Sequence, residues 1–556
     1  MKRKYLLLLT TLFVVPLMSS CKKKIISADD PTKANLHVGV FGGGIGGAWL
    51  EEAAVRFEEK FKDSTNFQQG RTGVKVHVKA TRDYYAPDFV DSNFDKDIYF
   101  TEDMDYISFI NKGKVLDMTD VMTTPLTAYG ESKSILDKIN EVEWTNDEEK
   151  TNKTAMVYDN FLNRNGKYYA IPYYDSFYGF VYNKTLFQKK GLYIKEGDGI
   201  KFTNNLSERS KGPDNVAGTY DDGLPTTYEE FGKLMDRMVA LNITPFLTSD
   251  AGREYVDNTL SNFWANYEGY DQMKINYNFN GTMKNHVQSI NDGVVTTNEV
   301  AITTQNGYEL QKSAGKYQAL NFLENYMLKD SKYHENVDTH LNAQYMYVFG
   351  SNNKNYGMII EGSWWENEAG QQNVWKKIAD NGDERDEYAL MPIPFVDKAH
   401  AEKMNYKQTR FSLSASYGFI SSNSSQVALA KEFMRFLHTD AELANFTKST
   451  SMTRPLAYNV SDEFYNSLTS YGKSLVDIKK SIDIVYPYGN TKLAINNYDD
   501  FKHKGWSWRS RIDSSTLFGP WQWRTTSGHT RADVTYFNGL YDYFSLNWSN
   551  FLDKAR

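Results

Sequence analysis

The stretch LHVGVFGGGIGGAWLEEAAVRFEEKF, residues 36–61, indicates the fold class. Apolar and other residues alternate over 36–41, which is typical of a strand, and a run of glycines follows at 42–47. One helix face then carries Leu50, Ala53, Ala54, Phe57 and Phe61. Valines alternate again from Val74 to Val78. A strand, a helix and a second strand in this order predict a right-handed βαβ unit of an α/β fold.

Similar patterns recur along the chain. We expect further strands at 97–100, 177–183 and 357–360, a helix opened by a capping box at 227–230, and a helix after a cap at 423–426. Two polar, glycine-containing stretches, 195–223 and 269–304, are predicted insertions.

The first residues have the pattern of an export signal. Basic residues 2–4 precede an apolar run over 5–18, and the chain's single cysteine, Cys21, follows two serines. This arrangement resembles the lipobox of bacterial lipoproteins, so we predict a signal peptide at 1–20, lipidation of Cys21 and an acylated tether at 21–35. The alternative is a plain secretory signal with an incidental cysteine.

Composition limits the function classes. The formal net charge of −7 argues against a nucleic-acid partner, which requires a basic face. Hydrophobic residues make up 40% of the chain, enough for a real core, and beyond the first segment no apolar run is long enough to span a membrane. Aromatic residues reach 15%, with 39 Tyr and 11 Trp. Such side chains suit the apolar faces and polar rims of sugar rings, although aromatics also fill cores.

Several segments occur in the order of one known family. They are 36–61, 97–100 with 113–120, 170–187, 191–192 with 224–231, 357–365, 389–394 and 417–437. With this set the chain resembles an ABC-transporter extracellular solute-binding protein of family 1, the maltodextrin-binding type. Tyr182-Asn183-Lys184 is the most specific part, Tyr228 stands where the family usually has Trp, and the tail after residue 456 matches poorly.

The resemblance implies a two-lobe, periplasmic-binding-protein-like α/β fold of type II, with hinge strands and a ligand cleft. It places lobe one at 36–168 and 396–455, lobe two at 170–393, and a C-terminal segment, 456–556, mainly on lobe two. It further implies capture of a mono- or oligosaccharide by hinge closure and delivery to the permease of an ABC importer. We expect a lipid-anchored, extracytoplasmic monomer that is not an enzyme and uses no cofactor.

The glycine run also fits other motifs. Gly42, Gly44 and Gly47 match the dinucleotide fingerprint G-x-G-x-x-G, but no acidic residue closes the next strand to hold a ribose. A phosphate-binding Walker loop fails because Ala48-Trp49 follows the last glycine. We therefore interpret the run as close backbone approach to a ligand at a helix N-terminus, with a mere tight turn as the alternative.

The candidate ligand contacts follow strands or lie in the matched loops. They are Phe41, Gly43, Gly44, Glu102, Asp103, Tyr173, Tyr174, Asp175, Ser176, Glu361, Trp364, Trp365 and Arg454. By resemblance, Trp364 stacks on a sugar ring; since neighbours on a strand face opposite ways, one of the two tryptophans belongs to the core. The alternatives are a solvated acidic loop at 102–103, hinge packing at 173–176 and a structural ion pair at Arg454.

Catalytic and metal signatures are weak. The nine histidines show no His-x-x-x-His pair, and no Gly-x-Ser-x-Gly elbow occurs. Asp214, Asp221 and Asp222 are weak calcium candidates, because their spacing does not fit an EF-hand and a turn explains them. The rival functions are an exported glycoside-processing enzyme, with a carboxylate pair or NAD, and a sensory or adhesive binding subunit. The tail tryptophans 506, 508, 521 and 523 either cap the cleft or fill a core.

Overall fold

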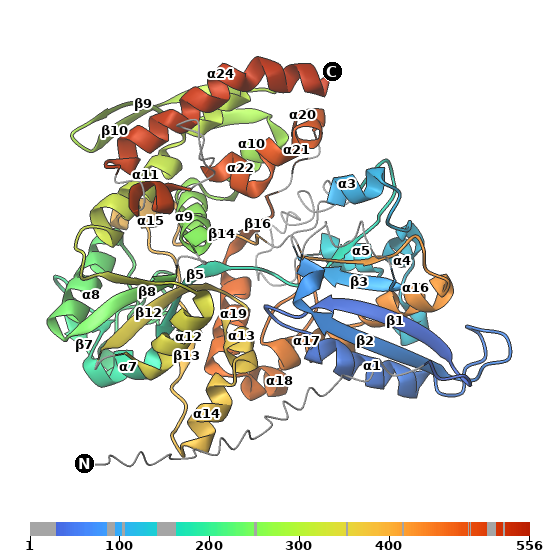
Figure 1. Cartoon of the computed structure of the whole chain (residues 1–556). Helices are drawn as coiled ribbons and strands as arrows, with labels where there is room; N and C mark the ends of the chain where they lie inside the picture. The colour runs from blue at the N-terminus through green and yellow to red at the C-terminus, as the bar shows by residue number, and fades with distance from the viewer. Residues whose placement is uncertain are drawn as a thin grey trace, which may run out of the picture.

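The chain folds into two α/β lobes that lie side by side (Figure 1). The computed structural model describes residues 29–85, 95–102, 106–141, 163–249, 253–351, 354–413, 416–487, 489, 491–508, 519–525 and 529–556. The two-lobe α/β fold confirms the predicted fold class. Cys21, the tether up to residue 28, and Asp103 lie outside the described residues.

The first lobe is built on a five-stranded sheet with the order β2-β1-β3-β15-β4. Its strands are β1 (Ala34–Phe41), β2 (Val74–Thr81), β3 (Ile98–Thr101), β4 (Ile171–Pro172) and β15 (Tyr417–Ile420). β1 is parallel to β2 and β3, and β15 is antiparallel to β3 and β4. Helix α1 (Ala48–Lys60) joins β1 to β2 and buries the predicted apolar face, so the strand–helix–strand unit is confirmed.

Two helices that follow β15 in the chain complete the first lobe. They are α16 (Val427–Phe436) and α17 (Asp440–Thr450), and α16 confirms the helix predicted after 423–426. The Phe57 ring of α1 meets the Phe433 ring of α16 with centroids 4.9 Å apart. Phe57 and Phe433, 376 positions apart, therefore share one core.

The second lobe has its own five-stranded sheet, with the order β11-β8-β12-β5-β13. Its strands are β5 (Tyr178–Asn183), β8 (Ile243–Ser249), β11 (His334–Val337), β12 (Asn355–Gly362) and β13 (Tyr388–Leu390). The main surrounding helices are α8 (Tyr228–Ala240), α9 (Arg253–Glu268), α11 (Ala314–Phe322), α12 (His340–Phe349) and α13 (Trp365–Gln371). Thr227 and Glu230 form the predicted capping box at the start of α8.

The two predicted insertions contain regular structure. The first holds the short ladder of β6 (Tyr193–Ile194) and β7 (Phe202–Thr203). The second folds as α10 (Tyr270–Asn278) and a hairpin of β9 (Gly281–Asn291) with β10 (Val294–Ile302). The C-terminal helix α24 (Phe537–Ala555) lies beside this hairpin (Figure 1), and the Trp548 indole nitrogen donates to the Thr304 carbonyl at 2.9 Å.

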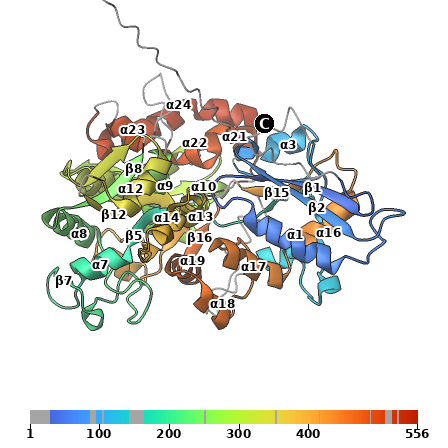
Figure 2. The ribbon, with the colours of Figure 1, turned by 60° about the horizontal axis from the view of Figure 1, so that its bottom comes forward.

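Helix α19 (Ser470–Ser481) and β16 (Asp483–Val485) lie between the lobes (Figure 2). β16 pairs with β14 (Thr409–Phe411), which contacts α9 of the second lobe. Just before β14, helix α15 (Lys398–Lys403) also packs there, because the His400 and Tyr267 rings stack at 4.4 Å. The chain thus re-enters the first sheet only at β15, and the lobe boundaries drawn from the sequence remain a proposal.

The tail tryptophans 506, 508, 521 and 523 are all buried in the second lobe's core, as the core interpretation expects. Lys316 anchors this tail from α11. Its buried ammonium donates to the carbonyls of Trp506 at 2.9 Å and Ser507 at 3.0 Å, and lies 4.4 Å from the Trp264 ring centroid. Among the described residues, no helix combines the length and the apolar character needed to cross a bilayer.

Candidate functional site

The glycine run lies between the two lobes. Gly44 has φ +52°, and a Cβ there would lie 3.1 Å from Glu102 Oε1 of the first lobe. Gly46 has φ +68°, and its Cβ would meet the amide of Gln371, which donates to the Gly44 carbonyl at 2.9 Å. A side chain at Gly43 would collide with the Phe41 ring. The run therefore allows close backbone approach, here to a side chain of the opposite lobe.

Glu102 is held by a tyrosine from the matched segment after β4. The Tyr174 hydroxyl donates to Glu102 Oε1 at 2.5 Å. Burial, followed by the charge of Glu102, raises the pKa of both Tyr173 and Tyr174. Tyr173 packs against Trp49 of α1 with ring centroids 6.1 Å apart, so it lies in the core, and Tyr174 presents the carboxylate.

The second lobe contributes an aromatic group. Trp364 meets Tyr178 edge-on at 4.9 Å and Tyr255 of α9 at 5.6 Å. Trp365 is fully buried against Tyr388 and other rings, and Trp364 is only 7% exposed, so both tryptophans pack in the core, and not one alone as the sequence argument expected. The sequence argument assumed that the two tryptophans lie on a strand. They lie instead at the start of α13, because β12 ends at Gly362.

Two buried carboxylates lie behind this group. The Gln344 amide nitrogen donates to Glu361 at 3.1 Å and to Glu368 at 2.9 Å. Burial and then the neighbouring Glu368 raise the pKa of Glu361 well above its usual value. Burial also raises the pKa of Glu368, but His340, Gln344 and Arg82 outweigh it and leave that pKa lowered. Arg82 comes from the first lobe, 3.5 Å from Glu368.

The hydroxyl of Tyr255 is affected by carboxylates of both lobes. Burial raises its pKa first, followed by the charges of Glu361 and Glu368 and that of Glu102 across the lobes. We call this region the lobe junction. It comprises Gly44, Arg82, Glu102, Tyr174, Tyr255, Gln344, Glu361, Trp364, Glu368 and Gln371.

Asp175 belongs to a different environment, where the chain crosses between lobes. Its carboxylate accepts bonds from the Tyr486 hydroxyl at 2.8 Å, the Thr453 hydroxyl at 2.8 Å and the Lys479 ammonium at 2.6 Å. The Ser412 hydroxyl, 3.4 Å from the same carboxylate, also accepts from the amide of Ser176 at 3.0 Å. These donors belong to separate chain segments, so we call Asp175, Ser412, Thr453, Lys479 and Tyr486 the hinge cluster.

Arg454 is also part of this buried crossing region. Its guanidinium lies 2.7 Å from His438 Nε2 and 4.8 Å from the Phe446 ring centroid, and its carbonyl accepts from Lys479. Such buried contacts are typical of a structural role, which is the alternative to ligand binding that the sequence left open for Arg454. These contacts do not test whether Arg454 or the other candidate residues touch a ligand. Their roles in ligand binding remain predictions.

The three aspartates of the first insertion hold their own loop. Asp221 accepts from the Thr219 hydroxyl at 2.7 Å and the Asp214 amide at 3.0 Å, and Asp222 accepts from the Gly218 amide at 2.8 Å. Burial, followed by the charge of Asp214, raises the pKa of Asp221 to about 8. The turn therefore uses these carboxylates locally, and the calcium assignment stays untested.

Sequence reasoning missed half of the lobe junction: Arg82, Tyr255, Gln344, Glu368 and Gln371. Glu368 and Gln371 follow Trp364 on α13, so helical spacing from that tryptophan could have found them. Tyr255 and Gln344 stand on helices without a motif, and only the tertiary arrangement brings them in.

Two lobes joined by a buried crossing, with polar and aromatic side chains where they meet, define a binding protein of the two-lobe type. The chain belongs to the bacterial extracellular solute-binding protein family, whose model matches residues 47–443. As a member of an extracellular family, it acts outside the cytoplasm. A search of curated protein sequences gave no match.

Solved structures share the fold at low sequence identity. The ABC substrate-binding protein Lmo0181 from Listeria monocytogenes, solved with cycloalternan, is 12% identical with a TM-score of 0.52, covering 93% of this chain and 99% of its own. The GacH receptor of Streptomyces glaucescens, solved with acarbose, is 12% identical with a TM-score of 0.51, and the match covers 92% of this chain and 98% of the receptor. UgpB from Mycobacterium tuberculosis, solved with glycerophosphocholine, is 14% identical with a TM-score of 0.50, and the match covers 94% of this chain and 99% of UgpB.

Proposed function

We propose that the protein captures a carbohydrate, a mono- or oligosaccharide, at the lobe junction and delivers it to the permease of an ABC importer. The observation that carries this proposal is the contact between the lobes beside Trp364: Gln371 of α13 donates to the Gly44 carbonyl at 2.9 Å, and the Trp364 ring packs against Tyr255. A sugar ring offers an apolar face to an indole and hydroxyl donors to carboxylates. Two of the structural neighbours were solved with the carbohydrates cycloalternan and acarbose, which supports this ligand class.

The ligand contacts divide between the lobes. In the first lobe we assign Glu102, presented by Tyr174, as an acceptor for sugar hydroxyls, and the backbone of Gly43 and Gly44 as the facing wall. In the second lobe we assign Trp364 as the stacking ring and Glu361 as a polar partner. A ligand that touches both lobes favours the closed form, so binding shifts the population without chemistry.

The hinge cluster supplies the pivot for this closure. Asp175, Ser176 and Arg454 are buried among the crossing segments, and the Asp175 carboxylate already accepts bonds from the chain. We therefore propose that these three residues position the lobes, and that Trp365 packs in the core behind Trp364.

The remaining assignments extend the same account. We propose that Cys21 carries the lipid that holds the protein at the membrane, that the protein works as a monomer, and that it turns over no substrate. Radiolabelled fatty acid should enter the wild type and not Cys21→Ala. Chromogenic glycosides test the rival enzyme, because turnover would favour glycoside processing over transport.

The test of the proposed function is a ligand panel. Thermal shift and calorimetry should be run with mono- and oligosaccharides beside peptides, polyamines and glycerophosphocholine. We expect the melting temperature to rise with at least one sugar, since a ligand that binds only the folded state stabilises it. A response to peptides, polyamines or glycerophosphocholine, with none to any sugar, would remove the carbohydrate claim.

A further inference from the structure

Two histidines face each other on the first sheet, away from the lobe junction. His37 of β1 and His77 of β2 are register partners on parallel strands. Directly opposed residues project to the same face of a sheet. Their rings stack with centroids 4.7 Å apart and planes 14° from parallel. Two imidazole nitrogens are thus presented together by rigid strands.

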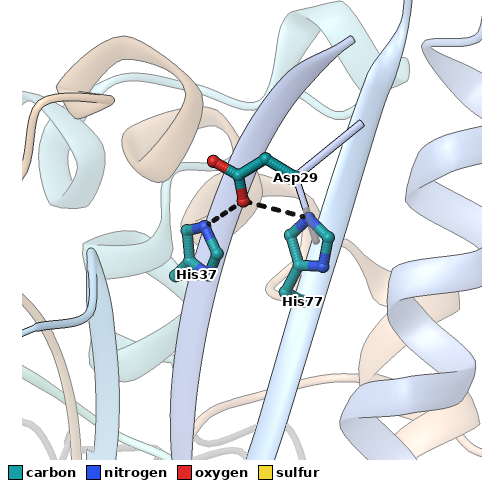
Figure 3. A group of neighbouring side chains, drawn as sticks. All are labelled: Asp29, His37 and His77. Atoms are coloured by element: carbon teal, nitrogen blue, oxygen red, sulfur yellow. Dashed lines mark hydrogen bonds and ion pairs between the residues drawn. The ribbon is translucent and has the colours of Figure 1, made fainter. Parts of the chain in front are cut away.

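A carboxylate faces both rings. Asp29 Oδ1 lies 2.9 Å from His37 Nε2 and 3.9 Å from His77 Nε2 (Figure 3). The ligand atoms of the three residues all lie within 4.8 Å of one another. A tetrahedral zinc ion with bonds of about 2.0–2.1 Å needs its donor atoms about 3.3 Å apart. Small side-chain rotations therefore suffice to form three zinc bonds.

Neighbouring residues fix the backbone of His37 and the turn beside Asp29. The His37 amide donates to Asp97 Oδ2 at 2.8 Å, and the Asp97 amide donates to the His37 carbonyl at 2.8 Å. Asn35 fixes the turn next to Asp29, since its amide donates to the Asp30 carbonyl at 2.9 Å and its oxygen accepts from the Asp30 amide at 2.9 Å. Such supporting contacts orient the ligands of a metal site before the metal arrives.

The Asn35 side chain also provides a further oxygen. Its Oδ1 lies 2.9 Å from His77 Nε2. Binding of a metal at Nε2 would therefore place the His77 proton on Nδ1. The Asn35 oxygen or a water is then available as the fourth donor.

The group is open to solvent. A cavity of about 390 Å³ borders it, lined in part by Asp29, Asp30, Asn35, His37 and Asp97. The Asp29 side chain is 63% exposed and the His37 side chain 30% exposed. An ion can reach Asp29 and His37 from this cavity, and the His77 side chain, 10% exposed, lies beside them.

We propose that Asp29, His37 and His77 bind a zinc ion at the amino end of the first sheet. Imidazole nitrogens with one carboxylate oxygen suit zinc better than magnesium or calcium. Asp29 belongs to the predicted tether and the histidines to β1 and β2, so the ion fastens the end of the tether to the lobe. β1 continues from His37 to the glycine run, which places the zinc at the opposite end of that strand from the lobe junction. The proposal does not depend on the sugar ligand.

The experiment uses the full chain purified without a histidine tag. Calorimetry and thermal shift with zinc chloride should give one zinc per chain and a rise in melting temperature. H37N and H77N should each weaken zinc binding by at least about tenfold, and the double variant should abolish it. H286N is the matched control. His286 also lies 2.9 Å from a carboxylate, that of Glu309, but it belongs to no three-ligand group within the described part of the chain.

D29N guards against damage to the fold, because this exposed side chain contributes nothing to the core. The single substitution D29N should weaken zinc binding, and the melting temperature measured without zinc should stay unchanged. Zinc affinity equal to the wild type in D29N and in the double variant would overturn the proposal, as would absence of zinc binding by the wild type. Sugar affinity should be the same with and without zinc.

Discussion

The hinge cluster and the lobe junction both bury carboxylates, but they surround them with opposite chemistry. Asp175 accepts bonds from an ammonium and from hydroxyls, so its charge is compensated within the chain. Glu361 shares the amide of Gln344 with a second carboxylate, and its pKa is raised by burial and by Glu368. A compensated cluster is typical of a structural role, and a carboxyl with a perturbed pKa is typical of a functional site. Substitutions should therefore reduce stability at the hinge cluster and affinity at the lobe junction.

The largest effect is expected from Lys479→Met. Removing the ammonium leaves the Asp175 carboxylate buried without its cation, which should lower the free energy of unfolding by about 3–5 kcal/mol. Chemical denaturation measures this loss. The double variant K479M/D175N should recover much of it, and K480M, on the exposed neighbour, should change little. Equal effects of K479M and K480M would refute the structural role of the hinge cluster.

Trp364→Ala should give the largest loss of affinity. A central aromatic contact of a binding site is worth about 2 kcal/mol or more, roughly a thirtyfold weaker sugar affinity by calorimetry. Stability should fall as well, because the ring is only 7% exposed and packs in the core. W375A, in the same lobe but outside the junction, serves as the control. If W375A reduces affinity as much as W364A, stacking at Trp364 is wrong.

The sequence predicted those elements whose pattern is local. The strand–helix–strand unit of 36–81 and the capping box of α8 depend on residues within one or two turns, and both are confirmed. The hinge cluster joins Asp175 to Lys479 across 304 positions, and the junction joins Gly44 to Gln371 across 327. No periodicity encodes such pairs. The facing histidines on β1 and β2 likewise require the strand register, which the sequence does not show.

Glu102→Gln is expected to have a smaller effect on binding. The amide keeps the shape but replaces a charge-assisted acceptor for sugar hydroxyls with a neutral one, a loss of about 1–2 kcal/mol or roughly tenfold in affinity. The melting temperature should change little. E229Q, on the exposed face of α8, is the matched control. An affinity for sugar that E102Q leaves intact would place the ligand elsewhere.

Glu361→Gln should show the smallest effect, in the pH dependence of stability. A carboxyl whose folded pKa is raised binds more protons in the folded state, so stability falls as pH rises from the unfolded pKa through the folded one. As the pH rises above the usual glutamate pKa of about 4.3, the wild type should lose more melting temperature than E361Q. Parallel curves for the two proteins would show that Glu361 does not carry this proton.

The most direct measurement is a crystal structure with the sugar that gives the largest thermal shift. We predict density for a sugar ring against the Trp364 indole, with a hydroxyl within hydrogen-bond distance of Glu102 and with both lobes in contact with the ligand. A sugar bound to one lobe only, or away from Trp364 and Glu102, would contradict binding at the lobe junction.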